Sequence, residues 1–390
     1  MKYWRGYLIA GIFAVFTAAL TAFAKANTTL MDMIYPYVTR ILVSFLADWS
    51  AGVSFCLWQL FALLLIAGLL ASIILMIVLK WNPIQWLGWV LATASCLFFL
   101  HTGIYSLNYH AGNIASDIRL DSTDYTVSEL NTATVYYMEQ ATALAQQMDR
   151  DDQGQLIFSP FDELAQQAGE GFTTLTYDYS FPIFSGATQP VKKLSWSSMY
   201  TRMGINGVTI NLTGEAAVNP EIPAIALPFV MCHEMAHRMS IAKESDANMA
   251  AFLACSVNSS DQFRYSGYFM AFRYCYNALA ASTTSAAQAC ITQINAKLDP
   301  LLLQDLNAYD AFYEENLSSS AASLANSAND NYLKVSGDEA GVASYTDVTN
   351  LLVSWYVQEL VIPQYTDDED RFDPLDPNQV DLTGLINPEA

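Results

Sequence analysis

Apolar residues are concentrated near the amino terminus of this chain, where three long runs carry no charged side chain. The runs cover residues 7–24, 55–79 and 84–105. A helix rises about 1.5 Å per residue, so it needs about 20 residues to cross a hydrocarbon core of about 30 Å. We therefore expect three transmembrane helices, the last two forming a tight hairpin around "KWNP".

Residues 26–54, between the first two runs, mix polar and apolar positions. Their apolar residues recur at helical spacing: Met31, Ile34, Tyr35, Val38, Ile41 and Leu42. This pattern is typical of an amphipathic helix that lies in the membrane interface. Residues 1–105 are thus predicted to form a membrane domain whose helices contact membrane lipid.

Basic residues predict the orientation of this membrane domain. Lys2 and Arg5 precede the first span, and Lys80 lies between the second and the third. Basic residues favour the cytoplasmic side of a membrane, whereas Lys25 and Arg40 in the first outer loop carry the opposite bias. We expect a multi-pass protein of the cell membrane, extracytoplasmic beyond about residue 106.

After residue 106 the pattern becomes typical of a water-soluble domain. A capping box, Thr126-x-x-Glu129, predicts a helix to about residue 148, and Ser159-Pro160 predicts a second helix that ends near residue 169. Alternating polar and apolar residues in "FTTLTYDYSF" and "GVTINL" predict strands.

Helices are expected over most of the remaining chain, at about 224–239, 244–256, 260–281, 285–297, 300–326 and 344–360. The predicted fold class is therefore α+β, mostly α, with a single outer domain over residues 106–362. Residues 363–390 are acidic and contain proline, which predicts a disordered tail.

Composition narrows the possible partners. Hydrophobic residues make up 53% of the chain and charged residues 14%, which agrees with a membrane portion. The net charge of −21, with only 17 basic residues, excludes a nucleic-acid partner because little positive charge offsets phosphate. Six cysteines do not make a disulfide framework in a chain of this length. Cys275 and Cys290 are candidates for a bridge, and free thiols are the alternative.

Two of the four histidines lie in the stretch "PFVMCHEMAHRMSIAKESDAN", residues 228–248. His233, Glu234 and His237 form the pattern H-E-x-x-H, and the neighbouring methionines and alanine favour a helix. Histidines at i and i+4 share one helix face, so both imidazoles can reach one Zn²⁺ at about 2.1 Å. Glu234 beside them is the candidate general base.

A catalytic zinc ion requires a third protein ligand. Glu244 and Asp246 both follow closely after His237. An unbroken helix would carry Glu244 about 10 Å along the axis from His237, which is too far for one metal ion. The chain must therefore turn between residues 238 and 243. Asn248, four residues after Glu244, is placed to support a ligand by a hydrogen bond.

The stretch "LPFVMCHEMAHRMSIAKESDANMAAFLAC" resembles the bacterial membrane family catalogued as domain of unknown function 3810. The similarity extends to "LNYH", "NLTGEAAVNPEIPAIALPF", "FRYSGYFMAFRYCYNAL" and "NDNYLKVSGDEAGVASYTDVTNLLVSWY", and so covers most of the chain. It implies three amino-terminal spans and a zincin-like outer domain. Glu244 matches the glutamate of the family's E-x-x-A-N element, which implies that Glu244, and not Asp246, is the third ligand.

One position departs from the family pattern. The family usually has glycine where Ser240 stands, just after the predicted H-E-x-x-H helix. Glycine readily adopts the left-handed conformation that often ends a helix, and serine does so less easily. The resemblance therefore leaves a question about how this chain turns after its two histidines.

Other residues are candidates for the cleft around the metal. The strand in "GVTINL" is expected to lie along the cleft and to pair with an extended substrate. Glu215 and Asn219 would shape the cleft. The candidate donors to an oxyanion are Arg264, Tyr265, Tyr268 and Arg273. His101 and His110, at the outer end of the third span, are expected to be interfacial.

The sequence predicts an integral membrane, gluzincin-like zinc metallopeptidase that acts on a peptide or protein. His233, His237 and Glu244 would hold Zn²⁺, and Glu234 would accept the proton of the attacking water. The alternative is a non-proteolytic zinc-binding membrane protein that acts as a sensor or an envelope-assembly factor. A third interpretation is a secreted peptidase, released by cleavage after "TAFA", which the two later spans oppose.

Overall fold

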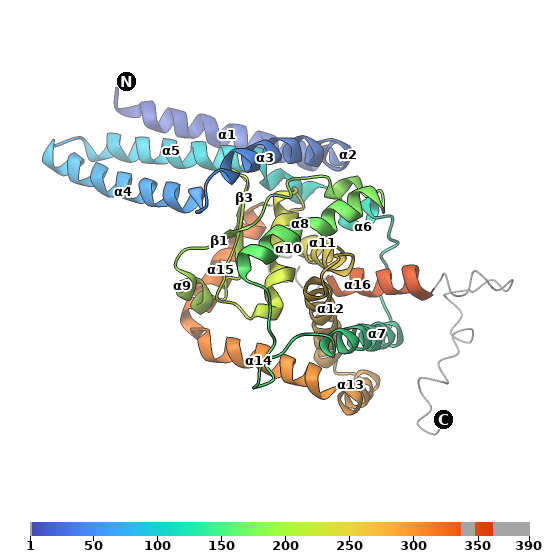
Figure 1. Cartoon of the computed structure of the whole chain (residues 1–390). Helices are drawn as coiled ribbons and strands as arrows, with labels where there is room; N and C mark the ends of the chain where they lie inside the picture. The colour runs from blue at the N-terminus through green and yellow to red at the C-terminus, as the bar shows by residue number, and fades with distance from the viewer. Residues whose placement is uncertain (1, 337–347, 362–390) are drawn as a thin grey trace.

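The computed structural model describes residues 2–336 and 348–361. Three long helices occupy the positions of the predicted spans: α1 (Arg5–Ala26), α4 (Leu57–Val78) and α5 (Pro83–Ile104). α1 and α5 pack along each other, and all three helices extend away from the rest of the molecule, as Figure 1 shows. Each is long and apolar enough to cross a membrane, so the chain has the features of a membrane protein.

A fourth stretch, Thr28–Ala51, also meets these criteria of length and composition. It consists of α2 (Thr28–Met33) and α3 (Tyr35–Ala51). Arg40 on α3 is buried, and it donates hydrogen bonds to the carbonyl oxygens of Met239 (3.0 Å) and Pro182 (2.9 Å) in the outer domain. A charged residue tied to the outer domain favours the predicted surface position over a transmembrane one.

The membrane helices pack unequally. The backbones of α1 and α5 touch at Gly6 and Gly88, where an added Cβ on Gly6 would overlap the Gly88 carbonyl group. By contrast, α4 buries only its first turn, at Leu57 and Gln59. That turn is held to the outer domain, because the Glu215 carboxylate accepts the backbone N–H groups of Leu57 (2.8 Å) and Trp58 (2.9 Å).

The domain beyond residue 105, called the outer domain after its predicted position, is mostly helical and has one main core. The central helices are α10 (Leu227–Arg238), α11 (Glu244–Ser256) and α12 (Asp261–Ala281), which pack on one another. The surrounding helices are η2 (Ser106–His110), α6 (Ile114–Asp117), α7 (Val127–Ala145), α8 (Phe161–Tyr177), η3 (Pro182–Phe184), α9 (Ser197–Met203), η4 (Ala224–Ala226), α13 (Ser285–Lys297), α14 (Pro300–Asn316), α15 (Ser319–Ser336), α16 (Val348–Tyr356) and a π-turn (Val357–Val361). The capping box predicted at Thr126 and Glu129 is present at the start of α7.

A small three-stranded sheet lies beside α10 and confirms the α+β, mostly α class. Its strands are β1 (Lys192–Lys193), β2 (Gly207–Ile210) and β3 (Glu215–Val218), in the order β1-β3-β2. β3 is parallel to β1 and antiparallel to β2. β2 is thus an edge strand, and it coincides with the strand predicted from "GVTINL".

The strand predicted from "FTTLTYDYSF" is wrong, because α8 continues through its first six residues to Tyr177. Threonine favours strands, but here the hydroxyls of Thr173 and Thr176 bond back to carbonyl oxygens four residues earlier. Tertiary packing decides the conformation, since Gly171 lies against the Ala254 backbone of α11. A helix turns Phe172 and Leu175 towards the same core.

Other boundaries also differ from expectation. The helix predicted over 300–326 is two helices, α14 and α15, separated at Leu317 and Ser318. The beginning of the helix predicted over 344–360 and the tail over 363–390 lie outside the described residues. All six cysteines, including Cys275 and Cys290, are free thiols.

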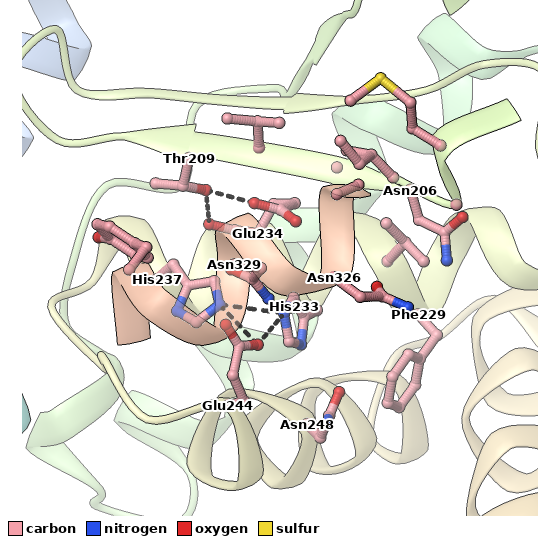
Figure 2. A pocket seen from close by; sticks show the side chains of 18 of the residues that line it. Asn206, Thr209, Phe229, His233, Glu234, His237, Glu244, Asn248, Asn326 and Asn329 are labelled. Atoms are coloured by element: carbon pink, nitrogen blue, oxygen red, sulfur yellow. Dashed lines mark hydrogen bonds and ion pairs between the residues drawn. The ribbon is translucent and has the colours of Figure 1, made fainter. Parts of the chain in front are cut away.

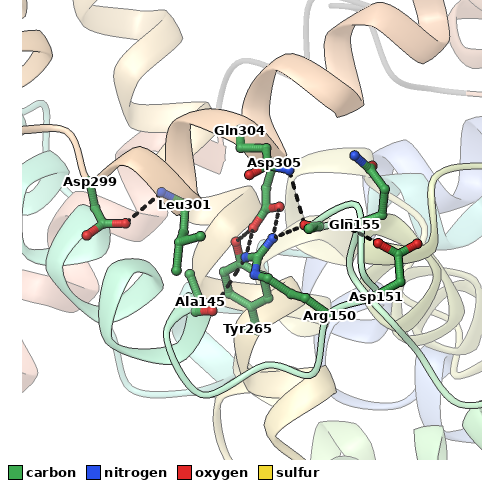
Figure 3. Close-up of polar contacts among 10 residues, drawn as sticks. Ala145, Arg150, Asp151, Gln155, Tyr265, Asp299, Leu301, Gln304 and Asp305 are labelled. Atoms are coloured by element: carbon green, nitrogen blue, oxygen red, sulfur yellow. Dashed lines mark hydrogen bonds and ion pairs between the residues drawn. The ribbon is translucent and has the colours of Figure 1, made fainter.

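A buried ion pair connects α14 to the loop that follows α7 (Figure 3). The Arg150 guanidinium donates to both carboxylate oxygens of Asp305, at 2.8 and 2.7 Å. The Tyr265 hydroxyl on α12 donates to the same carboxylate. Asp305 is 4% exposed and the Arg150 side chain 12%, so this network links three parts of the domain in a largely dry environment.

Candidate metal centre

The H-E-x-x-H pattern lies on α10, as the sequence predicts. His233 and His237 project from one face of this helix towards Glu244 on α11, and Glu234 points towards β2 (Figure 2). Pro228 occupies the first turn, where its missing N–H has no helical partner to lose. The single helical turn between the histidines brings their Nε2 atoms to 3.1 Å from each other.

The turn after α10 brings Glu244 back to the histidines. Ser240 has a φ of 69°, in the left-handed region that usually favours glycine. Its hydroxyl lies 3.0 Å from that of Thr39 on α3, and the Thr39 hydroxyl lies 3.2 Å from Asn108 Oδ1. These buried contacts offset the conformational cost of serine at this position. α11 then begins at Glu244.

The three predicted ligands converge on one point. Glu244 Oε2 lies 3.3 Å from His233 Nε2 and 3.4 Å from His237 Nε2. A tetrahedral zinc centre with bonds of about 2.0–2.2 Å places adjacent ligand atoms about 3.3–3.5 Å apart. These three residues therefore form a cluster that could bind a metal ion.

Asp246, the rival third ligand, lies elsewhere. Its carboxylate accepts the backbone N–H of Ile114 at 3.1 Å, at the start of α6. Burial raises the pKa of Asp246 to about 6, although Lys243 and the Ile114 N–H oppose the shift. Asp246 thus connects α11 to α6 and does not line the cleft around the histidines.

The second nitrogen of each histidine has a different environment. His237 Nδ1 lies 2.8 Å from the Ile241 carbonyl oxygen, so this nitrogen keeps its proton, and Nε2 is the nitrogen that would bind a metal once its own proton is lost. The Tyr105 hydroxyl, just past the end of α5, lies 3.2 Å from the same Nδ1. His233 Nδ1 and Asn248 Nδ2 are buried and have no hydrogen-bond partner among the described residues.

Glu234 is held apart from the ligands by β2. The Thr209 hydroxyl lies 2.7 Å from Glu234 Oε2 and 2.9 Å from the Glu234 carbonyl oxygen. Gly207 passes so close that a Cβ there would overlap the Glu234 carboxylate. Burial raises the pKa of Glu234, and the two histidines and Thr209 oppose that shift. The carboxyl group is therefore a stronger base than an exposed glutamate.

His237 and Glu244 shift each other's pKa in opposite directions. Burial lowers the pKa of His237, but the Glu244 carboxylate outweighs burial and raises that pKa to about 9. Burial likewise opposes ionisation of Glu244, but His237 and His233 bring its pKa well below the ordinary range. The carboxylate is thus ionised in an enclosed place, which is the form that binds a cation.

A cleft of about 600 Å³ surrounds the cluster. It is lined by β2 and by Met270 and Tyr274 of α12. α15 contributes Asn326, Asn329 and Tyr332. His101 at the end of α5 lines the cleft as well, 3.2 Å from the Tyr332 hydroxyl, so it faces the site and not only the membrane interface.

Several residues singled out in the sequence lie away from this cleft. The four candidate oxyanion donors on α12 make other contacts, with Asp261, Asp305, Tyr136 and Asp310. Glu215 anchors α4, and the Asn219 amide donates to Thr201. The cleft residues missed by sequence reasoning include five tyrosines, Tyr105, Tyr109, Tyr274, Tyr309 and Tyr332. No spacing relates these tyrosines to the H-E-x-x-H motif, so only the fold could show their convergence.

The outer edge of β2 is open within the sheet. The Asn219 N–H donates to the Asn206 carbonyl, which fixes the alternation of hydrogen-bonded pairs between β2 and β3. The backbone groups of Gly207 and Thr209 consequently point away from β3. Both residues line the cleft, so this edge presents backbone donors and acceptors beside Glu234.

Comparison with known proteins gives one family. The chain belongs to the family described as "Protein of unknown function (DUF3810)", whose model matches residues 31–353. No curated protein and no solved structure matches the chain.

Proposed function

We propose that this chain is an integral membrane zinc-dependent peptidase with a gluzincin-like site. His233, His237 and Glu244 would hold the zinc ion. The observation that carries the proposal is the position of Glu234, which lies outside the ligand trio yet lines the same cleft. A purely structural metal site has no use for a buried carboxylate beside the metal.

The edge of β2 supports a polypeptide substrate. An extended chain can add to an open strand edge through its backbone groups, and Gly207 and Thr209 offer such groups next to Glu234. A peptide paired there lies along the cleft, with one of its carbonyl groups near the histidines. This arrangement favours peptide hydrolysis over reactions of small molecules.

The proposed chemistry divides between the metal and the chain. Zinc, when bound, would polarise the substrate carbonyl and make a water molecule more acidic. Glu234 accepts the proton of the attacking water and delivers it to the leaving amine. The Thr209 hydroxyl keeps the Glu234 carboxylate in place. Tyr274, whose pKa is raised by burial, remains protonated and is the candidate donor to the oxyanion.

We further propose that the outer domain faces away from the cytoplasm. Lys2, Arg5 and Lys80 support this orientation because all three lie at the same end of the helices as the α4–α5 turn. Protease added to intact cells should digest the domain beyond residue 110 and leave α4 and α5 protected. Digestion of that domain only after lysis would reverse the orientation.

One observation favours the second candidate, a metal-binding protein that does not cleave peptides. α15 lines the cleft, and the Tyr332 hydroxyl contacts His101 at the end of α5. A helix in this position restricts entry to the metal centre. A sensor would use such a helix to report metal binding, whereas a peptidase must let it move.

A Glu234→Gln variant separates the two candidates. It keeps the shape of the side chain and removes the proton acceptor, whose contribution is typically about 10²–10⁴-fold in rate. The native chain and the variant should contain equal zinc by elemental analysis, and only the native chain should cleave members of a peptide library. Glu221→Gln, the same change at an exposed residue, is the control. A zinc-loaded native chain that cleaves nothing would favour the sensor.

A further inference from the structure

A second cavity lies in the membrane domain, between α1 and α5. It has a volume of about 520 Å³ and occupies the outer half of the two helices. The α1 side presents Ala14, Ala18 and Ala22, which recur every fourth residue on one face. Small residues at this spacing allow another helix to approach closely within a membrane. We call this cavity the α1–α5 groove.

The α1–α5 groove also contains two buried hydroxyls without partners. Thr102 Oγ1 and Ser106 Oγ line it and make no hydrogen bond with any described residue. Thr102 is 3% exposed and Ser106 4%. Threonines in membrane helices usually bond to the carbonyl four residues earlier, as Thr17 and Thr93 do here. Unpaired hydroxyls in such surroundings are costly unless a ligand pairs with them.

The groove and the metal cleft share their walls. His101 and Tyr105 line the cleft, and the residues that follow each of them, Thr102 and Ser106, line the groove. α15 does the same, with Tyr332 in the cleft and Ser336 in the groove. The end of α5 and the last turns of α15 thus separate the two cavities by a single layer of structure.

The metal centre is also close to the membrane. Tyr105 directly follows α5, and its hydroxyl lies 3.2 Å from Nδ1 of the ligand His237. The metal centre is therefore about one tyrosine side chain from the outer end of a span. Since an extended chain advances about 3.3 Å per residue, only the first few residues outside a membrane anchor are needed to reach it.

We propose that the α1–α5 groove binds the transmembrane helix of a membrane-anchored protein, and that the metal centre cleaves that protein a few residues outside its anchor. This inference rests on the proposed peptidase function. A helix suits the groove better than a lipid tail does. Alanines at every fourth position fit a helical backbone, and the hydroxyls of Thr102 and Ser106 can pair with polar groups that an acyl chain lacks.

Cleavage of one sequence in two forms tests the proposal. A peptide that the native chain cleaves is presented free, or fused to a single span with alanine at every fourth position. Both are offered to the full chain in vesicles of phosphatidylethanolamine and phosphatidylglycerol. Because docking raises the local concentration, the anchored form should be cleaved about 100-fold more efficiently. Ala18→Leu should abolish this advantage and leave cleavage of the free peptide unchanged.

Ala19→Leu is the matched control, because Ala19 is the next residue along α1 and does not line the groove. Equal effects of the two substitutions on the anchored form would overturn the groove as a docking site while leaving the peptidase intact. Failure to cleave the free peptide as well would instead count against the proposed function.

A binding experiment is independent of cleavage. Benzoylphenylalanine replaces Phe98, an exposed residue that lines the groove, or Phe16, an exposed residue that does not, in the Glu234→Gln chain, and the same single-span probe is added in vesicles. Crosslinking to the probe from position 98 and not from 16 supports helix binding. Crosslinking from position 98 to phospholipid alone would identify the groove as a lipid site and overturn the proposal.

Discussion

The molecule holds two buried clusters of charged groups, and they differ in how their charges are paired. Arg150 and Asp305 present opposite charges in a bidentate geometry, and Tyr265 adds a further donor. In the metal cluster, two histidines and Glu244 direct their lone-pair atoms at one common point. The first cluster is complete as an ion pair, whereas the second has the geometry of a coordination shell.

This difference distinguishes a structural role from a chemical one. The Arg150–Asp305 pair joins α14 to the loop after α7, and neither residue lines the metal cleft. The metal cluster opens to a large cleft and has Glu234 beside it. Burial of charge alone therefore does not identify a site, but converging acceptors in a cleft do.

The largest expected effect comes from removing a ligand of the metal cluster. Glu244→Ala should lower zinc affinity by more than about 100-fold, because even outer partners of ligands contribute about 10–100-fold. Asp246→Ala should leave zinc content near native, since its carboxylate bonds to Ile114 and not to the cluster. Elemental analysis of both purified variants checks this ranking, and the reverse ranking would refute the ligand assignment.

The second prediction concerns the loss of stability when the Arg150–Asp305 pair is broken. Asp305→Ala leaves the largely buried Arg150 guanidinium with only the carbonyl oxygens of Gly154 and Ala145 as acceptors, which should lower the free energy of unfolding by about 3 kcal/mol. Asp261→Ala removes the exposed partner of Arg264 and should cost at most about 1 kcal/mol. Urea denaturation measures both changes. Activity per folded molecule should be native in each variant; a selective loss in Asp305→Ala would give that residue a chemical role.

A substitution at Gly207 should have a smaller effect, because it displaces the Glu234 carboxylate without removing it. A methyl group at position 207 would overlap the Glu234 carboxylate, and a displacement of about 1 Å can reduce catalysis by about 100-fold. Gly207→Ala should therefore lower kcat up to that extent and retain zinc. Gly68→Ala, at a position with no atom within 4 Å of the added Cβ, is the control. Native kcat in Gly207→Ala would mean that Glu234 is not the base.

The smallest effect is expected at Tyr105. Its hydroxyl is the second and longer contact of His237 Nδ1, after the Ile241 carbonyl. Tyr105→Phe should weaken zinc binding by about 10-fold at most, because the carbonyl still fixes the imidazole. Competition with a zinc chelator measures the difference. A loss as large as that of Glu244→Ala would place Tyr105 among the ligands.

The sequence predicted the parts of this molecule that depend on local pattern. Charge-free runs located α1, α4 and α5, and the helical spacing of His233 and His237 placed both on one face. The return of Glu244 also followed, because no straight helix could bring it near. In each case a short stretch of chain determines the outcome.

Features set by distant contacts were not predictable in this way. The threonines of α8 suggested a strand, and the close approach of Gly171 to α11 made it a helix. Ser240 adopts a left-handed conformation that its sequence disfavours, because Thr39 lies 201 positions away in the chain and beside it in space. The tyrosines of the cleft come from four separate helical regions and meet only in the folded domain.

The contact between Gly6 and Gly88 is a point about which the angle between α1 and α5 can change. Their backbones touch near the end that holds the α4–α5 turn, and the sixteen residue steps from Gly6 to Ala22 span about 24 Å of helix. A change of about 5° in the angle between the helices would thus move their outer ends by about 2 Å. Helix tilt responds to bilayer thickness. A change in bilayer thickness would therefore shift the end of α5 to which Tyr105 and the metal centre are attached.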